Sequence, residues 1–255
     1  FCRAVNEGIR RADTEYVSLV NNDPTVEKQF VFRLRKAVRG REDAFSVGAK
    51  MLSMQEPEII DDAGDLYCAL GWAYARGKGK NRENFSRPAE IFAACAGAAI
   101  YRKSVFDTIG YFDENHFAYL EDIDIGYRAK ISGFHNYFEP DAVVYHAGSA
   151  VSGSRYNEFK VKLSSKNSIY LVYKNMPVLQ ICLNSLFLLA GILIKLVFFV
   201  KKGLGRTYLR GIGEGIGLCF SREGRRRKVR FRTECLGNYV RIQMELWMNI
   251  ARRLK

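Results

Sequence analysis

Residues 117–124 read Phe-Ala-Tyr-Leu-Glu-Asp-Ile-Asp, and here an aromatic, apolar run becomes a helical pattern. Three carboxylates, Glu121, Asp122 and Asp124, fall within four residues. Because clustered acids repel one another, a fold keeps them mainly for proton transfer, metal binding or buried pairing. A helix that begins at Glu121 holds Asp122 ionised in its first turn, where free N–H groups and the helix dipole stabilise negative charge. We therefore predict that Asp122 is a general base toward a hydroxyl, with Glu121 beside it.

Other interpretations of this segment stay open. Asp124 and Arg128 are four residues apart, a spacing that favours an ion pair within the helix over chemistry. All three acids also fit a plain acidic helix start that transfers no proton.

A second acidic spot follows the apolar run Tyr16–Val20. Such a run predicts a strand that is buried on both faces of a mostly parallel sheet. Ligands of open α/β sheets gather at the carboxyl ends of the strands, which is where Asn22 and Asp23 fall. We predict that Asp23 binds a hard cation, Mg²⁺ or Mn²⁺, and that Asn22 adds a neutral oxygen for a bound cofactor. An Asx turn before Pro24 is the structural alternative.

Three further residues are candidates for the site. His146 ends an apolar strand pattern and can complete a metal site or contact phosphate, although a lone His is more often structural. Gly97 lies in a small, apolar run and indicates either close backbone approach to a ligand or a bulge. Arg102 is a candidate phosphate contact or the start of a solvated helix. The six cysteines form no CxxC pair, which argues against a disulfide scaffold and a zinc site.

The alternation of helical and strand patterns predicts an α/β fold. We expect helices at residues 3–12, 25–38, 104–109, 121–132 and 156–176, and strands at residues 16–20, 45–52, 91–101, 134–138 and 142–146. Residues 53–90 are expected to form loops with short strands. We divide the chain into a catalytic domain, residues 1–154, and a helical, basic, membrane-associated region, residues 155–255.

Several segments together resemble the family 2 glycosyltransferases of the GT-A fold, in particular their rhamnosyltransferase-like branch. The segments that carry the resemblance are residues 6–9, 16–23, 95–102, 110–114, 117–124 and 140–146. The resemblance implies that Asp122 is the base of an inverting transfer and that Asn22 and Asp23 stand at the metal-binding motif, with His146 completing the metal shell. It also implies a sheet whose first strands bind the nucleotide, and we expect the catalytic domain to lack those strands in this chain.

By this resemblance, the chain is expected to move a sugar from a nucleotide-sugar donor to a hydroxyl of a lipid-linked or cell-surface polysaccharide acceptor, assisted by Mg²⁺ or Mn²⁺. A sugar nucleotidyltransferase and a non-enzymatic membrane-bound adaptor are the alternatives. Because nucleotide sugars are cytosolic, we expect the protein at the cytoplasmic face of the cell membrane.

The C-terminal region joins an apolar helix to a strong positive charge. Residues 178–200 are mostly apolar and just long enough to cross a bilayer. Residues 201–255 hold 15 Lys or Arg against four Glu, a net charge of +11. This pattern favours an anionic membrane surface over nucleic acid as a partner. A single crossing cannot leave a cytosolic catalytic domain and the basic tail on one side, so we prefer an in-plane or re-entrant helix with Lys195 snorkelling. A true span and a buried core helix are the alternatives.

Overall fold

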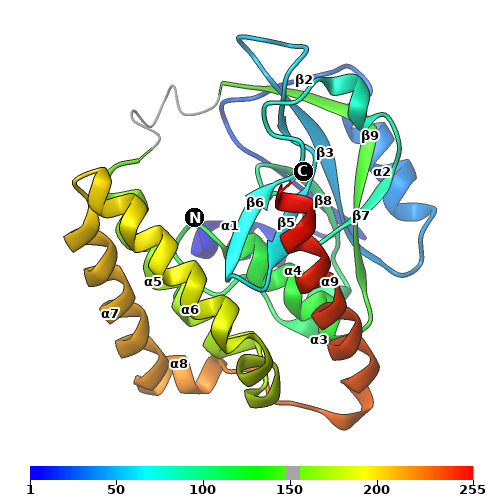
Figure 1. Cartoon of the computed structure of the whole chain (residues 1–255). Helices are drawn as coiled ribbons and strands as arrows, with labels where there is room; N and C mark the ends of the chain where they lie inside the picture. The colour runs from blue at the N-terminus through cyan, green and yellow to red at the C-terminus, as the bar shows by residue number, and fades with distance from the viewer. Residues whose placement is uncertain (148–155, 255) are drawn as a thin grey trace.

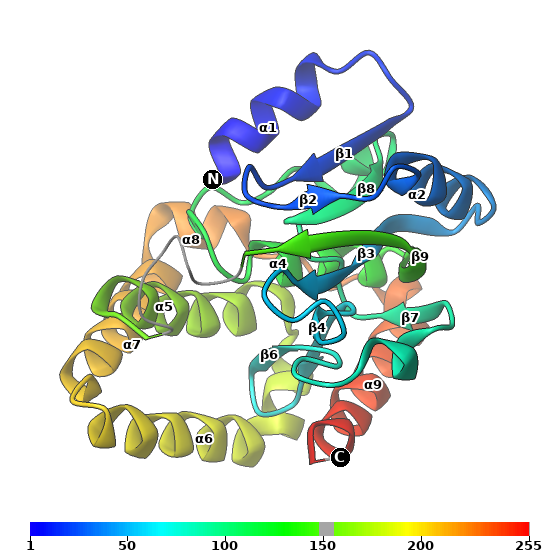
Figure 2. The same ribbon diagram turned by 90° about the horizontal axis from the view of Figure 1, so that it is seen from above.

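The computed structural model describes residues 1–147 and 156–254, and in it helices cover both faces of a mixed sheet (Figures 1 and 2). The elements in chain order are α1 (Cys2–Arg11), β1 (Tyr16–Val20), β2 (Thr25–Val26), α2 (Phe30–Arg39), β3 (Ala44–Ser53), β4 (Ile60–Asp62), β5 (Asp65–Cys68), β6 (Trp72–Ala75), η1 (Arg82–Phe85), β7 (Ala89–Ile91), β8 (Ala98–Arg102), α3 (Val105–Ile109), α4 (Glu121–Ile131), β9 (His135–His146), α5 (Glu158–Asn175), α6 (Val178–Lys201), α7 (Gly205–Phe220), α8 (Arg222–Arg227), η3 (Thr233–Cys235) and α9 (Leu236–Leu254).

The main sheet has the strand order β1-β8-β3-β9-β2, with β4 added to β3 and β7 added to β9. Among these described strands only β3 and β9 pair in parallel, and the other pairs are antiparallel. The predicted α/β fold with flanking helices is confirmed, but the prediction of a mostly parallel sheet is wrong. An apolar run reports burial and carries no information about the direction of the neighbouring strand.

Strand β1 is also less buried than its sequence predicts. Within the described residues it pairs with β8 alone, so one of its edges is open. Val17 is buried, whereas Val20, two residues before Asn22, is 41% exposed. The apolar run therefore forms an edge strand whose carboxyl end reaches the surface.

Three predicted elements differ in the structure. The strand expected at residues 91–101 is divided into β7, which ends at Ile91, and β8, which begins at Ala98. The helix expected from residue 25 begins only at Phe30, because the β-branched pair Thr25–Val26 joins the sheet against β9. The two strands expected around Pro140 form one strand, β9, whose pairing with β3 shifts register beside Pro140. A proline that cannot donate to the ladder is accommodated at such an irregularity.

The helices form two layers over the sheet. Helix α2 packs against β3, β8 and β9, and its core includes Phe30, Leu34 and Val47. On the opposite side, α3 and α4 contribute to a second core with Phe45 and Ile125. Helices α5 and α9 pack in turn on α4, and all three share apolar side chains with β5. The first acids of α4 are thereby held between the sheet and the C-terminal helices.

The chain beyond residue 155 is continuous with this packing. The boundary at residues 154 and 155 lies outside the described residues, and the division into two domains stays a prediction. Helices α5, α6 and α7 lie together on one side of the sheet, and α7 contacts both α5 and α6 (Figure 2). Helix α6 is long and apolar enough to cross a membrane, and only 11% of its most apolar window is buried. The interpretation of α6 as a buried core helix is therefore wrong.

Candidate active site

Asp23 and His146 lie together, as predicted. The Nε2 atom of His146 is 3.3 Å from Oδ2 of Asp23, which follows β1. The other ring nitrogen, Nδ1, is 2.8 Å from Oδ2 of Asp61, a residue of β4. Asp61 in turn pairs with Lys78. The imidazole at the end of β9 is therefore held between two carboxylates.

The contact between Asp61 and His146 is strongly polarised. Burial alone would raise the pKa of Asp61, but hydrogen bonds from His146 and Lys78 outweigh it and lower this pKa to about 2. The same hydrogen bond to Asp61 raises the pKa of His146. Asp61 thus stays ionised and fixes the ring, so that Nε2 faces Asp23.

These residues fit a divalent cation. The Oδ1 atom of Asp23 is buried and has no hydrogen-bond partner, which leaves an oxygen that lacks the contact it needs. Carboxylate oxygen and imidazole nitrogen are ligands that Mn²⁺ accepts. A metal-bound His usually donates its other N–H to a carboxylate, which is the position of Asp61. Asp23 and His146 would hold the ion, and Asp61 would orient the ring.

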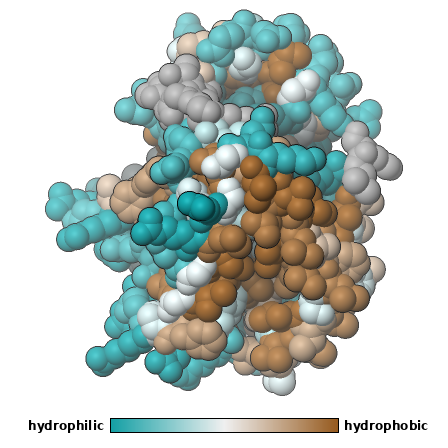
Figure 3. All heavy atoms as spheres, turned by 60° about the vertical axis from the view of Figure 1, so that its left-hand side comes forward, coloured by the Kyte–Doolittle hydropathy of each residue, from teal (hydrophilic) through white to brown (hydrophobic). Residues whose placement is uncertain are grey.

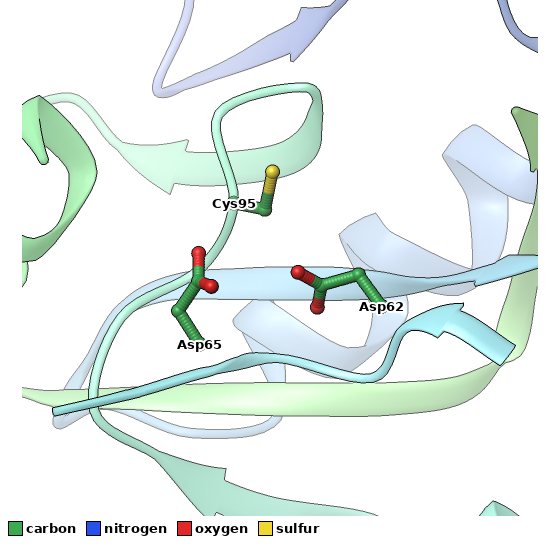
Figure 4. Close-up of side chains that lie close together, drawn as sticks. All are labelled: Asp62, Asp65 and Cys95. Atoms are coloured by element: carbon green, nitrogen blue, oxygen red, sulfur yellow. The ribbon is translucent and has the colours of Figure 1, made fainter. Parts of the chain in front are cut away.

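A second group of acids lies on the other side of β4. Figure 4 shows the carboxylates of Asp62 and Asp65 directed toward each other with Cys95 beside them, and the ligand atoms of all three lie within 4.8 Å of one another. Asp65 begins β5 and shares a hydrogen bond with Asp122. Asp61 and Asp62 are consecutive residues, so β4 joins the His146 site to the acids around Asp122.

Three acids near Asp122, namely Asp62, Asp65 and Glu121, all have raised pKa values. Burial raises the pKa of Asp65 well above its usual value, and the charges of Asp62 and Asp122 raise it further. Burial likewise raises the pKa of Asp62 to about 7. For Glu121 burial, followed by the charge of Asp122, raises the pKa to about 8. Asp65 therefore keeps the proton that it shares with Asp122.

The helix start favours the ionised form of Asp122, but burial of the side chain opposes it. The N–H of Ile123 does donate to Asp122 Oδ1, at 2.7 Å. Burial nevertheless raises the pKa of Asp122, because the loss of water outweighs this hydrogen bond and the one from Asp65. A base whose pKa lies closer to neutral is better suited to accept a proton from a hydroxyl.

The turn before α4 has a strained backbone. Phe117, Tyr119 and Leu120 have φ angles of 63°, 67° and 66°. Left-handed conformations cost a residue with a side chain roughly 1 kcal/mol or more, and they collect at functional sites. Asn167 of α5 holds this turn, since its Nδ2 atom donates to three backbone carbonyls at 2.7–2.9 Å. Helix α5 thereby sets the position of Asp122.

Asp124 has the structural role expected from its spacing. Its Oδ2 atom is 2.8 Å from Arg128 and 2.8 Å from Lys174, and its side chain is fully buried. Asn175 donates to the other carboxylate oxygen at 2.9 Å. The predicted ion pair is confirmed, and it ties α4 to α5.

The acids around Asp122 border a cavity of about 520 Å³. Its lining includes Asn21, Asp65, Gly97, Glu121 and Asp122. A larger cavity of about 880 Å³ adjoins it and is bordered by Asp61. The two share the lining residues Ala73, Tyr74, Ala75, Tyr119 and Ser164. Asp61 and Asp122 therefore border one continuous hollow.

The remaining predicted residues take different places. Gly97 lines the smaller cavity, and a Cβ there would come within 3.2 Å of the Asn21 side chain, so a larger residue would crowd this wall. Asn22 is exposed beside Asp23, and Asn21 lines the cavity instead. Arg102 does not reach either cavity. Its guanidinium donates to the carbonyls of residues 38, 41 and 44. Arg102 therefore stabilises the connection between α2 and β3, and the prediction that it contacts a phosphate is not supported.

Sequence reasoning missed Asp61, Asp62 and Asp65. They fall in residues 53–90, which are irregular apart from short strands, as predicted. Three acids within five residues are nearly as dense as those at 121–124. That density was the available signal.

Comparison with known proteins agrees with the resemblance drawn from the sequence. No model of a protein family matches the chain. The N-acetylglucosaminyl-diphospho-decaprenol L-rhamnosyltransferase of Mycobacterium tuberculosis strain CDC 1551 / Oshkosh is 40% identical over 96 residues, which are 36% of this chain and 31% of that protein. The same enzyme of strain ATCC 25618 / H37Rv matches equally well. The matched part thus spans about a third, 31%, of the length of these curated relatives.

Solved structures extend the similarity to the fold. The crystal structure of GalNAc-T7 with UDP, GalNAc and Mn²⁺ superimposes with a TM-score of 0.51 at 14% identity, covering 68% of this chain and 34% of that chain. A mannosyltransferase from Pyrobaculum calidifontis in complex with GDP-Man and Mn²⁺ has a TM-score of 0.45 at 12% identity, covering 100% of this chain and 66% of that chain. The predicted GT-A-like fold and the likeness to rhamnosyltransferases are confirmed.

Proposed function

We propose that this chain carries the catalytic centre of an inverting glycosyltransferase, which moves a sugar from a nucleotide-sugar donor to a hydroxyl of a lipid-linked or cell-surface glycan. The observation that carries the proposal is the continuous hollow bordered by Asp61 and Asp122. Asp61, which holds the ring of His146, lines one part of it, and the carboxylate of Asp122 lines the other. The rhamnosyltransferase similarity supports this class of reaction.

Asp122 would accept the proton of the acceptor hydroxyl as that oxygen attacks the anomeric carbon. Asp65 donates a hydrogen bond to Asp122 and stabilises its ionised form. A divalent cation on Asp23 and His146 would neutralise the charge that develops on the departing diphosphate. Direct displacement with one base inverts the anomeric configuration and needs no covalent enzyme intermediate.

Substitution of the base tests this proposal. Asp122→Asn keeps the size of the side chain and removes the proton acceptor, so transfer should fall about 10²–10⁴-fold. Donor affinity should change little, because the cation site is intact. Asp141→Asn, at an exposed acid of β9, is the matched control. Sugar transfer and donor binding are measured with Mn²⁺, and turnover of a nucleoside triphosphate is measured in parallel. Wild-type transfer by Asp122→Asn would exclude this assignment.

We further propose that the protein works at the cytoplasmic face of a membrane, with α6 lying in the interface. The molecule presents a broad hydrophobic area on the side formed by the C-terminal helices (Figure 3). Its outward residues on α6 include Leu179, Leu186 and Val197, and Leu186 is 80% exposed. Large exposed apolar areas mark contact with a membrane or with a partner. The basic residues after α6 would then meet anionic lipid.

A further inference from the structure

The larger cavity holds an excess of positive charge. It lies where β6, α6 and the end of α9 come together, and it adjoins the cavity of Asp122. Six cationic side chains line it: Lys78, Lys80, Lys160, Lys195, Arg252 and Arg253. Among the described residues of this lining Asp61 is the one acid, and it already pairs with Lys78 and His146. The cavity therefore suits a ligand that brings several negative charges.

Two of these cations converge on one aromatic ring. Lys195 Nζ is 5.5 Å from the centroid of the Trp72 ring, and the Arg253 guanidinium is 5.2 Å from it. Across residues 1–147 and 156–254, no ion pair is found for either of them. The ammonium of Lys195 is therefore directed toward Trp72, and the expectation that it snorkels along α6 stays a prediction. Two like charges held together without a carboxylate are costly unless an anion joins them.

The walls of the cavity suit a ligand with an apolar tail. Phe199 of α6 lines the cavity beside Lys195. The neighbours of Lys195 along α6, Leu193, Ile194 and Val197, are all at least half exposed. A hydrocarbon chain that leaves the cavity therefore meets a continuous apolar surface. In the other direction the cavity shares Tyr119 and Ser164 with the cavity of Asp122.

We propose that this cavity binds the diphosphate of a lipid-linked acceptor, with Lys195, Arg252 and Arg253 as its charged contacts. The prenyl chain would leave along α6, and the sugar on the diphosphate would extend past Tyr119 toward Asp122. This inference rests on the proposed transferase function, because it assigns the acceptor of that reaction. It separates the acceptor diphosphate from the donor diphosphate, which belongs with the cation on Asp23 and His146.

Binding of farnesyl diphosphate to the full chain, measured by calorimetry in detergent with EDTA and without donor, tests the site. Lys195→Gln/Arg253→Gln keeps two methylenes of each side chain and removes two charges, and we expect affinity to fall at least tenfold. Lys202→Gln/Arg206→Gln, at exposed cations outside the cavity, should bind as the wild type does. Farnesol, which has the same chain and no charge, should bind the wild type far more weakly.

Three results would overturn the proposal: equal affinity of the cavity variant and the wild type, equal affinity of farnesol and farnesyl diphosphate, or displacement of farnesyl diphosphate by an equal concentration of a nucleoside diphosphate. The last would assign the cavity to the donor.

Because this binding assay requires no turnover, it is independent of the transferase assignment. A wild type that binds farnesyl diphosphate and transfers no sugar contradicts the proposed function alone. Intact transfer to a neutral acceptor with unaltered binding in the cavity variant contradicts this inference alone.

Discussion

Asp65 determines how readily Asp122 accepts a proton. The two share a hydrogen bond in which Asp65, with the higher pKa, is the donor, and this bond lowers the pKa of Asp122 against the effect of burial. In the sequence only the density of acids at residues 61–65 singles this residue out, and its effect on Asp122 is not evident there. It is a positioning residue, and its effect should appear in the pH dependence of transfer.

We expect Asp65→Ala to move the acid limb of the kcat/KM profile to higher pH by about one unit. The reason is that loss of a hydrogen bond to a charged group raises the pKa of Asp122, and one unit corresponds to about 1.4 kcal/mol. Asp65→Asn keeps a hydrogen-bond donor to Asp122, so the acid limb of its kcat/KM profile should lie near that of the wild type. Superimposable profiles for wild type and Asp65→Ala would refute the role.

Glu121 makes stability depend on pH in the opposite sense from a salt-bridged acid. Its side chain is buried, its Oε2 atom has no hydrogen-bond partner, and burial raises its pKa from 4.5 to about 8. The folded protein therefore retains a proton that the unfolded chain has lost between these pH values. Stability falls as the pH rises through this window, by at most about 5 kcal/mol.

Glu121→Gln removes this titration. We expect the variant to be more stable than the wild type at pH 8, by up to a few kcal/mol, and to lose that advantage near pH 4, where Glu121 is protonated in both states. Urea unfolding at the two pH values measures the difference. An advantage of the same size at both pH values would show that ionisation of Glu121 is not the cause.

At the scale of elements, the start of α4 depends on α5. Three left-handed residues precede Asp122. Asn167, about 50 positions later in the chain, donates to the carbonyls of His116, Ala118 and Tyr119 in the same turn. Local sequence does not favour such a turn. The packing of α5 must therefore contribute the free energy that keeps it in place.

Asn167→Ala should lower kcat at least tenfold and leave the KM for the donor within about twofold. Release of the turn displaces the base, and small displacements of a catalytic group have large effects on rate. Ser168→Ala is the matched control, since Ser168 donates only within α5, to the carbonyl of Ser164. Steady-state kinetics decide, and a rise in donor KM with unchanged kcat would place the effect elsewhere.

At the scale of the whole molecule, the exposed side of α6 decides where the protein works. Substitution of Leu179 and Leu186 by Ser removes apolar surface that contacts little else in the protein, so thermal stability should change little. Binding to anionic vesicles should fall at least tenfold, because each buried Leu contributes about 1.5–3 kcal/mol. Val31→Ser/Phe32→Ser, at exposed apolar residues of α2, is the control. Co-sedimentation with vesicles measures binding, and equal binding of both variants would contradict the role of α6.

The sequence by itself determined the α/β class, the helices α1 and α3 to α6, the strands β1 and β3, the length of α6 and the pairing of Asp124 with Arg128. These follow from periodicity, caps and spacing along a short stretch of chain. It also predicted Asp23, His146 and Asp122 as site residues, and the structure places Asp23 and His146 in contact.

Only the tertiary structure decided the directions of the strands, the protonation of the acids and the membership of Asp61 and Asp65 in the site. Strand direction depends on which distant segment pairs with which, and the pKa of Asp122 depends on how much water the packed helices exclude. Asp61 and Asp65 lie in an irregular segment, where no period links a side chain to a face. Their roles arise because β4 pairs with the end of β3 near His146 and β5 packs against α4, and that arrangement depends on contacts between residues far apart in the chain.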